Sequence, residues 1–443
     1  MSPVRLSVVA TAAALYLLTA CSGEAPPASQ TAEKAGTVGL DDIARDYIGL
    51  VLRLGEHDDA FVDAFYGPDA WREEAQADPR APSSIAESAR ALAAAAGRAT
   101  VSGDDPLNET RRRYLVTQLG AVAARADMVA GTSYSFDEET RLLYDAVSPP
   151  RDATHFQAVL EKIDAIVPGD GPLPDRVDAF RKSFEIPADR LAAVFEAAIE
   201  ECRKRTEPWV SLPSNESFRV EYVKDKPWGG YNWYQGDANS LIQVNTDLPL
   251  RINRAVDLGC HEGYPGHHVY NVLLEKNLVR DRGWPEFSVY ALFSPQSLIA
   301  EGSANYGIKM AFPGDERTEY ERTVLFPLAG LDESTAGDFY ALEELLAELS
   351  YVSNEVARRF LDGDIDRAQA KEWLIDFQLR TPESAEKGLE FMAAYRGYVI
   401  NYNVGLDMVE AYVERAAPDG DPAARWSAFT RLLSSPMLPA DLQ

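Results

Sequence analysis

Hydrophobic residues recur at helical spacing along most of the chain. Residues 191–199 (LAAVFEAAI) are rich in helix formers and follow a proline and an acidic residue at 187–189, which are typical of a helix start. Residues 341–349 (ALEELLAEL), with paired glutamates and leucines, predict a second helix. Residues 240–246 (SLIQVNT) differ, because apolar and polar side chains alternate and several are β-branched, which indicates a strand. The sequence therefore predicts a mainly α fold with a small β-sheet.

Three of the five histidines fall within one short run, at His261, His267 and His268. The run opens like the zinc-peptidase motif H-E-x-x-H, but Pro265 occupies the position of the second histidine. On an unbroken helix the later histidines would lie about 9 to 10.5 Å further along the axis than His261, which is too far to share one ion. We therefore expect the helix to deform at Pro265 and Gly266.

A two-residue bulge at Pro265 and Gly266 would restore the H-E-x-x-H spacing, with His267 as the second zinc ligand and Glu262 as the general base. His268 is the alternative second ligand, because spacing does not determine the geometry of a bulge. Catalytic zinc normally takes three protein ligands, and Glu301 in the later run 300–306 (AEGSANY) is the candidate for the third. The alternatives are a polar turn without metal and a metal site without catalysis.

Two motifs together carry a resemblance to a known family. The combination of His261-Glu262-x-x-Pro265-Gly266-His267-His268 with Glu301-Gly302-x-Ala304-x-Tyr306 resembles the bacterial domain-of-unknown-function family 885, which is grouped with the zinc peptidases. The later run 402–405 (YNVG) is similar to the Y-x-x-G element of that family. Ser303 stands where the family usually has tryptophan, which suggests a different pocket wall.

The resemblance covers most of the chain after its N-terminal segment. It implies a large helical gluzincin-like fold, in which the helix carrying H-E and a downstream helix carrying the glutamate surround a Zn²⁺ ion beside a small β-sheet. It does not imply a particular substrate.

The N-terminus resembles a bacterial lipoprotein signal. Arg5 precedes an apolar stretch at 6–18, and the run 18–21 (LTAC) is similar to a lipobox. We therefore expect residues 1–20 to be removed and Cys21 to be lipidated, which would place the protein in the bacterial envelope, on the periplasmic side of an outer membrane if the cell has one. The alternative is a plain signal peptide with an incidental cysteine.

The remaining chain is expected to form a tether and two lobes. Residues 21–39 are rich in Ala, Pro, Ser, Gly and Thr, which is typical of a flexible tether. A folded part of about 400 residues is larger than a single hydrophobic core usually supports. We therefore expect a helical N-terminal lobe at 40–210 and a zinc-binding catalytic lobe at 211–443.

The net charge bears on the kinds of binding partner that we expect, and the cysteines bear on disulfide bonding. The formal net charge of −27 argues against nucleic-acid binding and against electrostatic adhesion to anionic lipid, so membrane attachment would come from Cys21. An even distribution of solvated acids explains this charge as well as an acidic substrate-binding surface does. Whether Cys202 and Cys260 pair is left open by the sequence.

Residues Gln243 and Asn245 of the predicted strand are candidates for substrate binding. Zinc peptidases often place an edge strand beside the metal, where an extended peptide can form main-chain hydrogen bonds with it. A small structural sheet is the equally weighted alternative.

The C-terminal aromatic residues offer a second group of candidates. Tyr395, Tyr398 and Tyr402 are spaced as one face of a helix, a pattern more often found in a core than in an active site. We expect Tyr402 to donate to the oxyanion formed during hydrolysis, Tyr398 to contact substrate and Arg396 to bind a substrate carboxylate.

These residues predict a lipid-anchored, zinc-dependent hydrolase, most specifically a metallopeptidase acting on a peptide substrate. The alternatives are a catalytically inactive metal-containing binding lipoprotein and a structural envelope protein. Glu262 favours the hydrolase, because a binding site needs ligands but no base beside them. The oligomeric state and the cleavage specificity are left open.

Overall fold

A computed structural model describes residues 39–101, 103–226 and 228–443. The expected signal segment, Cys21 and the tether up to residue 38 lie outside the described residues. Within the described ranges, no helix is both long and apolar enough to cross a membrane.

The chain before residue 210 is mainly helical, and the predicted helix at 191–199 is confirmed as part of α8. Its helices are α1 (Leu40–Gly55), α2 (Asp69–Ala77), α3 (Pro82–Arg98), α4 (Pro106–Val129), α5 (Phe136–Tyr144), α6 (Ala153–Ile166), α7 (Leu173–Lys182) and α8 (Leu191–Thr206).

Helices also dominate the chain after residue 250, and the predicted helix at 341–349 is confirmed by α14 and the 3₁₀ turn that follows it. The α-helices there are α9 (Asn253–Leu258), α10 (His267–Leu274), α11 (Pro295–Ala311), α12 (Glu316–Tyr320), α13 (Phe326–Ala329), α14 (Ala336–Glu348), α15 (Val352–Leu361), α16 (Arg367–Gln378), α17 (Pro382–Tyr395), α18 (Val404–Ala416) and α19 (Pro422–Leu433).

A three-stranded sheet interrupts the helices. It consists of β2 (Ser217–Val223), β3 (Gly230–Gly236) and β4 (Asn239–Asn245), in the order β2-β4-β3, with β4 parallel to β2 and antiparallel to β3. The predicted strand and the mainly α fold with a small sheet are confirmed. Of the two alternatives for this strand, an edge beside the metal and a small structural sheet, the structure contradicts the edge, because β4 forms ladders on both sides and has no free main-chain edge to offer a peptide.

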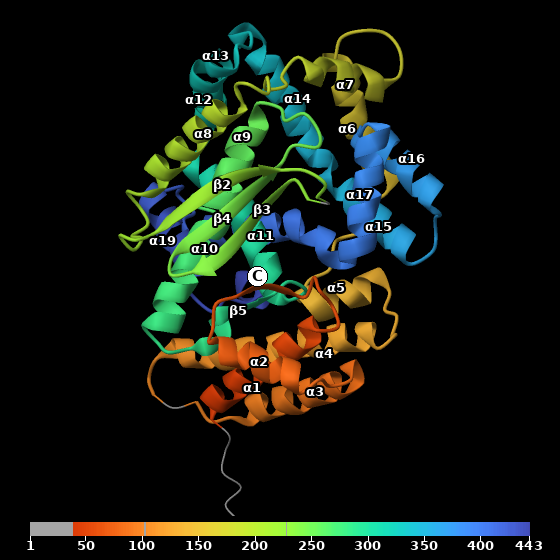
Figure 1. Ribbon diagram of the computed structural model, residues 1–443. Coiled ribbons are helices and arrows are strands. Elements are labelled where there is room, and N and C mark those ends of the chain that lie inside the picture. The colour runs from red at the N-terminus through yellow and green to blue at the C-terminus, as the bar shows by residue number, and fades with distance from the viewer. Residues whose placement is uncertain (1–38, 102, 227) are drawn as a thin grey trace, which may run out of the picture. The chain divides into compact units, whose positions relative to one another are not determined.

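A second, smaller sheet joins distant parts of the chain. Strand β1 (Val62–Phe65) pairs with β5 (Val289–Ala291), which directly precedes α11. In Figure 1 the three-stranded sheet and α17 lie on opposite sides of α11, with β5 below. The pairing with β1 therefore holds the strand that leads into α11, the helix that carries Glu301.

The described residues from 39 onward form one compact unit, and the predicted lobe boundary near residue 210 falls inside it. Contacts cross that boundary: Arg111 Nε on α4 donates to Glu286 Oε1 at 2.6 Å, and both side chains are buried. Such a pair costs desolvation energy and is retained only with good geometry, so it fixes α4 against the segment that leads into β5.

The tyrosine-rich segment after α17 is not one helix. Arg396 has a φ of 52°, and a 3₁₀ helix, η7 (Arg396–Tyr402), follows it. The buried Glu139 of α5 stabilises this turn, because its carboxylate accepts from Gly397 N–H at 2.9 Å and from Arg396 Nε at 2.7 Å. The prediction that the three tyrosines share one helical face is therefore wrong.

Cysteines 202 and 260 form a disulfide, the pairing that the sequence left open. The bond joins α8 to a short π-helical segment, η1 (Gly259–Gly263), which carries His261 and Glu262. It therefore ties the histidine motif to a neighbouring helix.

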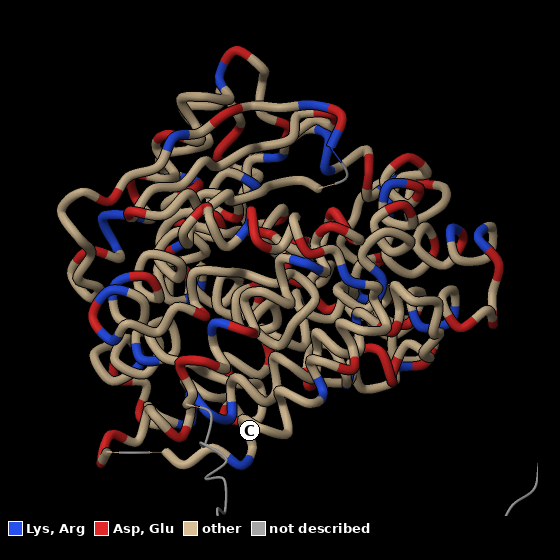
Figure 2. Tube along the Cα trace, turned by 60° about the horizontal axis from the view of Figure 1, so that its bottom comes forward, with Lys and Arg blue, Asp and Glu red and all other residues tan. Residues whose placement is uncertain are grey.

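Acidic residues are distributed over the described trace and are interspersed with lysine and arginine (Figure 2). This agrees with the interpretation of the net charge as an even distribution of solvated acids.

Candidate metal centre and pocket

The helix that leads into the histidine motif ends and restarts. It runs from α9 through η1 to Gly263, and α10 begins at His267. Between them Gly266 N–H donates to the carbonyl of Cys260 at 3.0 Å. A Cβ atom at Gly266 would lie 1.8 Å from the carbonyl oxygen of His261, so only glycine fits this crossing of the backbone. The expected deformation is present, as a break between two helices rather than a bulge within one.

The break brings two imidazoles together with a carboxylate. The ring centroids of His261 and His267 are 4.6 Å apart, and Glu301 on α11 faces both rings. Nε2 of His261 lies 3.2 Å from Glu301 Oε2, and Nε2 of His267 lies 3.6 Å from Glu301 Oε1. One donor atom from each residue can be chosen so that all three lie within 4.8 Å of one another.

The structure places His268 away from this cluster. Its ring is fully buried, with Nδ1 2.9 Å from Ser240 Oγ and Nε2 2.9 Å from Glu216 Oε2. Both ring nitrogens are therefore occupied beneath the β2-β4-β3 sheet. The geometry favours His267 over His268 as the second ligand.

Further hydrogen bonds orient the candidate ligands. Asn305 Nδ2 donates to the carbonyl of Tyr402 at 2.9 Å, so its Oδ1, 2.9 Å from His261 Nδ1, accepts a hydrogen bond from the N–H at that nitrogen. Nε2 of His261 then carries the lone pair that a metal needs. On the other side, the hydroxyl of Tyr398 donates to Glu301 Oε1 at 2.7 Å.

Two glycines allow the helices behind the cluster to approach closely. A Cβ atom at Gly302 would lie 2.3 Å from the carbonyl oxygen of Gly405, and one at Gly405 would lie 2.6 Å from the carbonyl oxygen of Leu298. Helices α11 and α18 thus touch through their backbones. The Glu301 motif and the later run at 402–405 meet in this contact. Ser303 is buried and donates to its own helix at Ala300, so it is no part of the pocket wall.

Glu262 lies beside the cluster with one free oxygen. The residue is 4% exposed, and its Oε2 is buried without a hydrogen-bond partner. Gly230 of β3 leaves the space for it, since a Cβ there would lie 2.7 Å from Glu262 Oε1. Asn232 Nδ2 holds the main chain by donating to the carbonyl of Glu262 at 2.7 Å.

The electrostatics reflect this crowding of acids and imidazoles. Burial raises the pKa of Glu262, against the opposing effect of the two imidazoles. Burial alone would lower the pKa of His267, but the carboxylates of Glu301 and Glu262 outweigh it and raise that pKa to about 9. Burial alone would raise the pKa of Glu301, but the histidines hold it well below its usual range. The carboxylates of Glu301 and Glu262 therefore stabilise a positive charge at this position, whether it is a protonated imidazole or a bound cation.

These residues fit a zinc ion. Two imidazole nitrogens and one carboxylate are the protein ligands that catalytic zinc takes, with a further position left for water. Glu301 Oε2 is buried without a hydrogen-bond partner, although burying a carboxylate oxygen without one is costly. A cation coordinated by that oxygen would compensate this cost.

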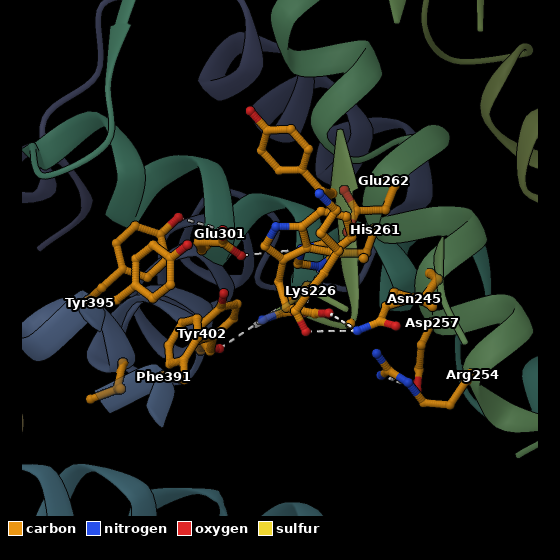
Figure 3. A pocket seen from close by; sticks show the side chains of 18 of the residues that line it. Lys226, Asn245, Arg254, Asp257, His261, Glu262, Glu301, Phe391, Tyr395 and Tyr402 are labelled. Atoms are coloured by element: carbon orange, nitrogen blue, oxygen red, sulfur yellow. Dashed lines mark hydrogen bonds and ion pairs between the residues drawn. The ribbon is translucent and has the colours of Figure 1, made fainter. Parts of the chain in front are cut away.

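The cluster opens into a cavity of about 1250 Å³. In Figure 3, Tyr395 and Tyr402 lie on one side of it, and Asn245 and Arg254 on the other. The hydroxyl of Tyr402 makes no hydrogen bond with another residue of the described chain, and the residue as a whole is 38% exposed. It is therefore free to donate to a substrate.

The other residues predicted to bind substrate already form hydrogen bonds within the protein. Gln243 and Asn245 line the cavity, but Asn245 Nδ2 donates to the carbonyls of Lys226 and Trp228, and Gln243 contacts Glu221 at 3.4 Å. Tyr398 lines the cavity and binds Glu301.

Arg396 does not line the cavity, and its guanidinium pairs with the buried Glu139. The structure therefore contradicts the predicted carboxylate-binding role of Arg396. The prediction failed because the turn at Arg396, which directs its side chain toward Glu139 of α5, cannot be recognised from the sequence.

Two residues of the site have no place in the sequence prediction. Asn305 lies one helical turn after Glu301, and this spacing could have identified it. Asp63 of β1 lines the same cavity, and burial raises its pKa to about 7, with Glu301 and Glu262 adding to the effect. Nothing in the sequence around Asp63 indicates that β1 pairs with β5 and so reaches the cluster.

No protein-family model matches the chain, and no curated protein matches it. Among solved structures, a candidate lipoprotein from Colwellia psychrerythraea is similar at a TM-score of 0.50 and 16% identity, over 82% of this chain and 66% of that one. The chain thus spans slightly less than two thirds of that protein, and at this identity the likeness concerns the fold alone.

Two further structures are more distant. A candidate lipoprotein of unknown function from Shewanella oneidensis has a TM-score of 0.43 at 12% identity, over 82% of this chain and 75% of that one. The M32 carboxypeptidase of Deinococcus radiodurans R1 also has a TM-score of 0.43, at 14% identity, over 91% of this chain and 93% of that one. Neither likeness carries an argument about function.

Replacing the two adjacent histidines separately should distinguish their roles. We expect His267→Ala to abolish stoichiometric zinc binding, because it removes one of three ligands. His268→Ala should keep the zinc but lower the free energy of unfolding by about 1–3 kcal/mol, since Glu216 loses a buried partner. Elemental analysis and thermal unfolding of both variants measure these effects, and zinc retained by His267→Ala but lost by His268→Ala would reverse the assignment.

Proposed function

We propose that this protein is a zinc-dependent hydrolase, and specifically a metallopeptidase that cleaves peptide substrates in the cavity described above. His261, His267 and Glu301 would hold the ion, and Glu262 would act as the general base. Membership of the domain-of-unknown-function family 885 is part of the same proposal.

One observation carries the proposal: the unpartnered Oε2 of Glu262 lies in the same buried pocket as the three candidate ligands. Burying a carboxylate oxygen without a partner is costly, and a catalytic role is one reason for a protein to retain such a group. A metal-binding or structural protein needs ligands but no such base. The free oxygen therefore favours hydrolysis over these alternatives.

The chain's own residues suggest how the reaction proceeds. Glu262 accepts a proton from the attacking water and transfers it to the leaving amine. Burial raises the pKa of Glu262, which suits a group that must first take and then return a proton near neutral pH. The free hydroxyl of Tyr402 can donate to the oxygen that becomes negatively charged at the scissile carbonyl.

The cofactor contributes the remaining chemistry. Bound zinc would polarise the carbonyl and lower the pKa of water to about 7. Asn305 and Tyr398 would orient two of the ligands, an arrangement whose loss typically costs about 10–100-fold in metal affinity or activity.

The proposed location is the bacterial envelope, with the mature chain attached to the membrane through lipidated Cys21. The lipobox-like run 18–21 supports this, and similarity to a candidate lipoprotein agrees with it.

The proposed base can be tested without disturbing the metal. We expect Glu262→Gln to keep stoichiometric zinc and to lose at least about 10²- to 10⁴-fold in kcat, because an amide cannot accept the proton. Zinc content and cleavage of a peptide library measure the two effects, with Glu109→Gln, an exposed carboxylate on α4, as the matched control. Near-normal turnover by the zinc-loaded Glu262→Gln variant would remove Glu262 from the reaction.

The anchor has a separate test. Replacing Cys21 by alanine should release the full-length protein from the membrane fraction, because the acidic chain has little electrostatic attraction to anionic lipid. Fractionation and mass spectrometry of the mature N-terminus detect the change. Undiminished membrane association of Cys21→Ala would require a different anchor.

A further inference from the structure

One arginine of the cavity differs from the others. Arg251 pairs with Asp178 at 3.5 Å, while Arg254 and Arg317 both pair with Asp257, at 3.2 and 2.8 Å. Arg380 lines the same cavity but makes no ion pair within the described part of the chain. In a protein with 70 acidic and 43 basic residues, an arginine without an acidic partner is unexpected.

Arg380 is held in place by neutral groups alone. Its Nη1 lies 3.4 Å from the carbonyl of Ser384, and its Nη2 lies 3.3 Å from Ser353 Oγ, which are long hydrogen bonds. Gly388 makes room for the guanidinium, because a Cβ atom there would lie 2.2 Å from Nη1. Burial lowers the pKa of Arg380 to about 10, and no nearby acid opposes the shift. The site therefore carries a positive charge whose loss of hydration is not compensated.

Helix α17 connects this arginine with the metal cluster. One face of α17 (Pro382–Tyr395) lines the cavity with residues at helical spacing, namely Ser384, Lys387, Gly388, Phe391 and Tyr395. Ser384 and Tyr395 are eleven positions apart, which corresponds to about 16 Å of helix axis at 1.5 Å per residue.

The Tyr395 end of α17 lies near the cluster. The rings of Tyr395 and Tyr398 are 6.1 Å apart, Tyr398 donates to Glu301, and Figure 3 shows Tyr395 and Glu301 on the same side. One cavity thus joins the two sites.

We propose that Arg380 binds the C-terminal carboxylate of a peptide whose scissile bond lies at the metal cluster. The proposal rests on the peptidase function proposed above and adds a substrate class, namely short peptides with a free C-terminus. A guanidinium matches a carboxylate with two parallel hydrogen bonds. An extended chain covers about 3.3 Å per residue, so roughly five residues would separate the cleaved bond from the C-terminus.

The test uses one library of mixed octapeptides and decapeptides, synthesised with a free C-terminus and again as the C-terminal amide. The zinc-loaded full-length protein should cleave the acids with a kcat/KM about 10–100-fold higher than the amides. Mass spectrometry should find cleavage at a fixed distance of about four to six residues from the C-terminus in both peptide lengths. Cleavage at a fixed distance from the N-terminus would overturn the proposal, as would equal rates for acids and amides.

Variants separate recognition from folding. Arg380→Gln should reduce cleavage of the acids to the level of the amides while leaving the amides unchanged, and Arg380→Lys should keep part of the preference. Arg251→Gln, in which a paired arginine of the same cavity is replaced, should retain the full preference. Equal losses on acids and amides in Arg380→Gln would assign Arg380 a structural role and overturn the proposal.

Two further experiments complete the test. The first asks whether Arg380 recognises the C-terminal carboxylate or a side-chain carboxylate, and the second tests the role of Arg380 independently of peptidase activity. Amidated peptides ending in glutamate should stay poor substrates, and full rescue by that side chain would overturn the assignment to the C-terminus. If no peptide is cleaved, the peptidase proposal fails, and calorimetric binding of the acid and amide libraries then decides the role of Arg380. Tighter binding of the acids that is lost in Arg380→Gln supports the role, and equal binding overturns it.

Discussion

The candidate metal centre depends on the break in the backbone between Gly263 and His267. In a continuous helix, the six-residue separation of His261 and His267 would place them about 9 Å apart along the axis. The break instead brings their ring centroids to 4.6 Å. It requires glycine at position 266, because any side chain there would overlap the carbonyl of His261. The Cys202–Cys260 disulfide fixes the segment just before the break to α8.

The rest of the site is built against this break by close backbone packing and hydrogen bonds. The contact between Gly302 and Gly405 lets α18 approach α11, and in this arrangement Asn305 binds both His261 and the carbonyl of Tyr402. Glu139 of α5 holds the turn from which Tyr398 reaches Glu301. Elements from both sides of residue 210 therefore determine how the ligands are oriented.

The sequence was sufficient for the mainly helical fold and the strand at 240–246, because these follow from local periodicity. It also proposed the residues that the structure brings together around Glu301, since their spacing reflects a chemical requirement. It was insufficient where long-range contacts decide the geometry. Strand β4 is central because β2 and β3 pair with it from both sides, and Arg396 turns away because Glu139 binds it. Asp63 and Arg380 reach the cavity through tertiary packing that no local pattern records.

X-ray absorption at the zinc edge, combined with anomalous diffraction from zinc-loaded crystals, tests the central claim most directly. The account predicts one ion bound by His261 Nε2 and His267 Nε2 at about 2.0–2.1 Å and by Glu301 at about 2.0–2.2 Å, with a further oxygen ligand from water. An ion bound elsewhere, or one coordinated by His268, would contradict it.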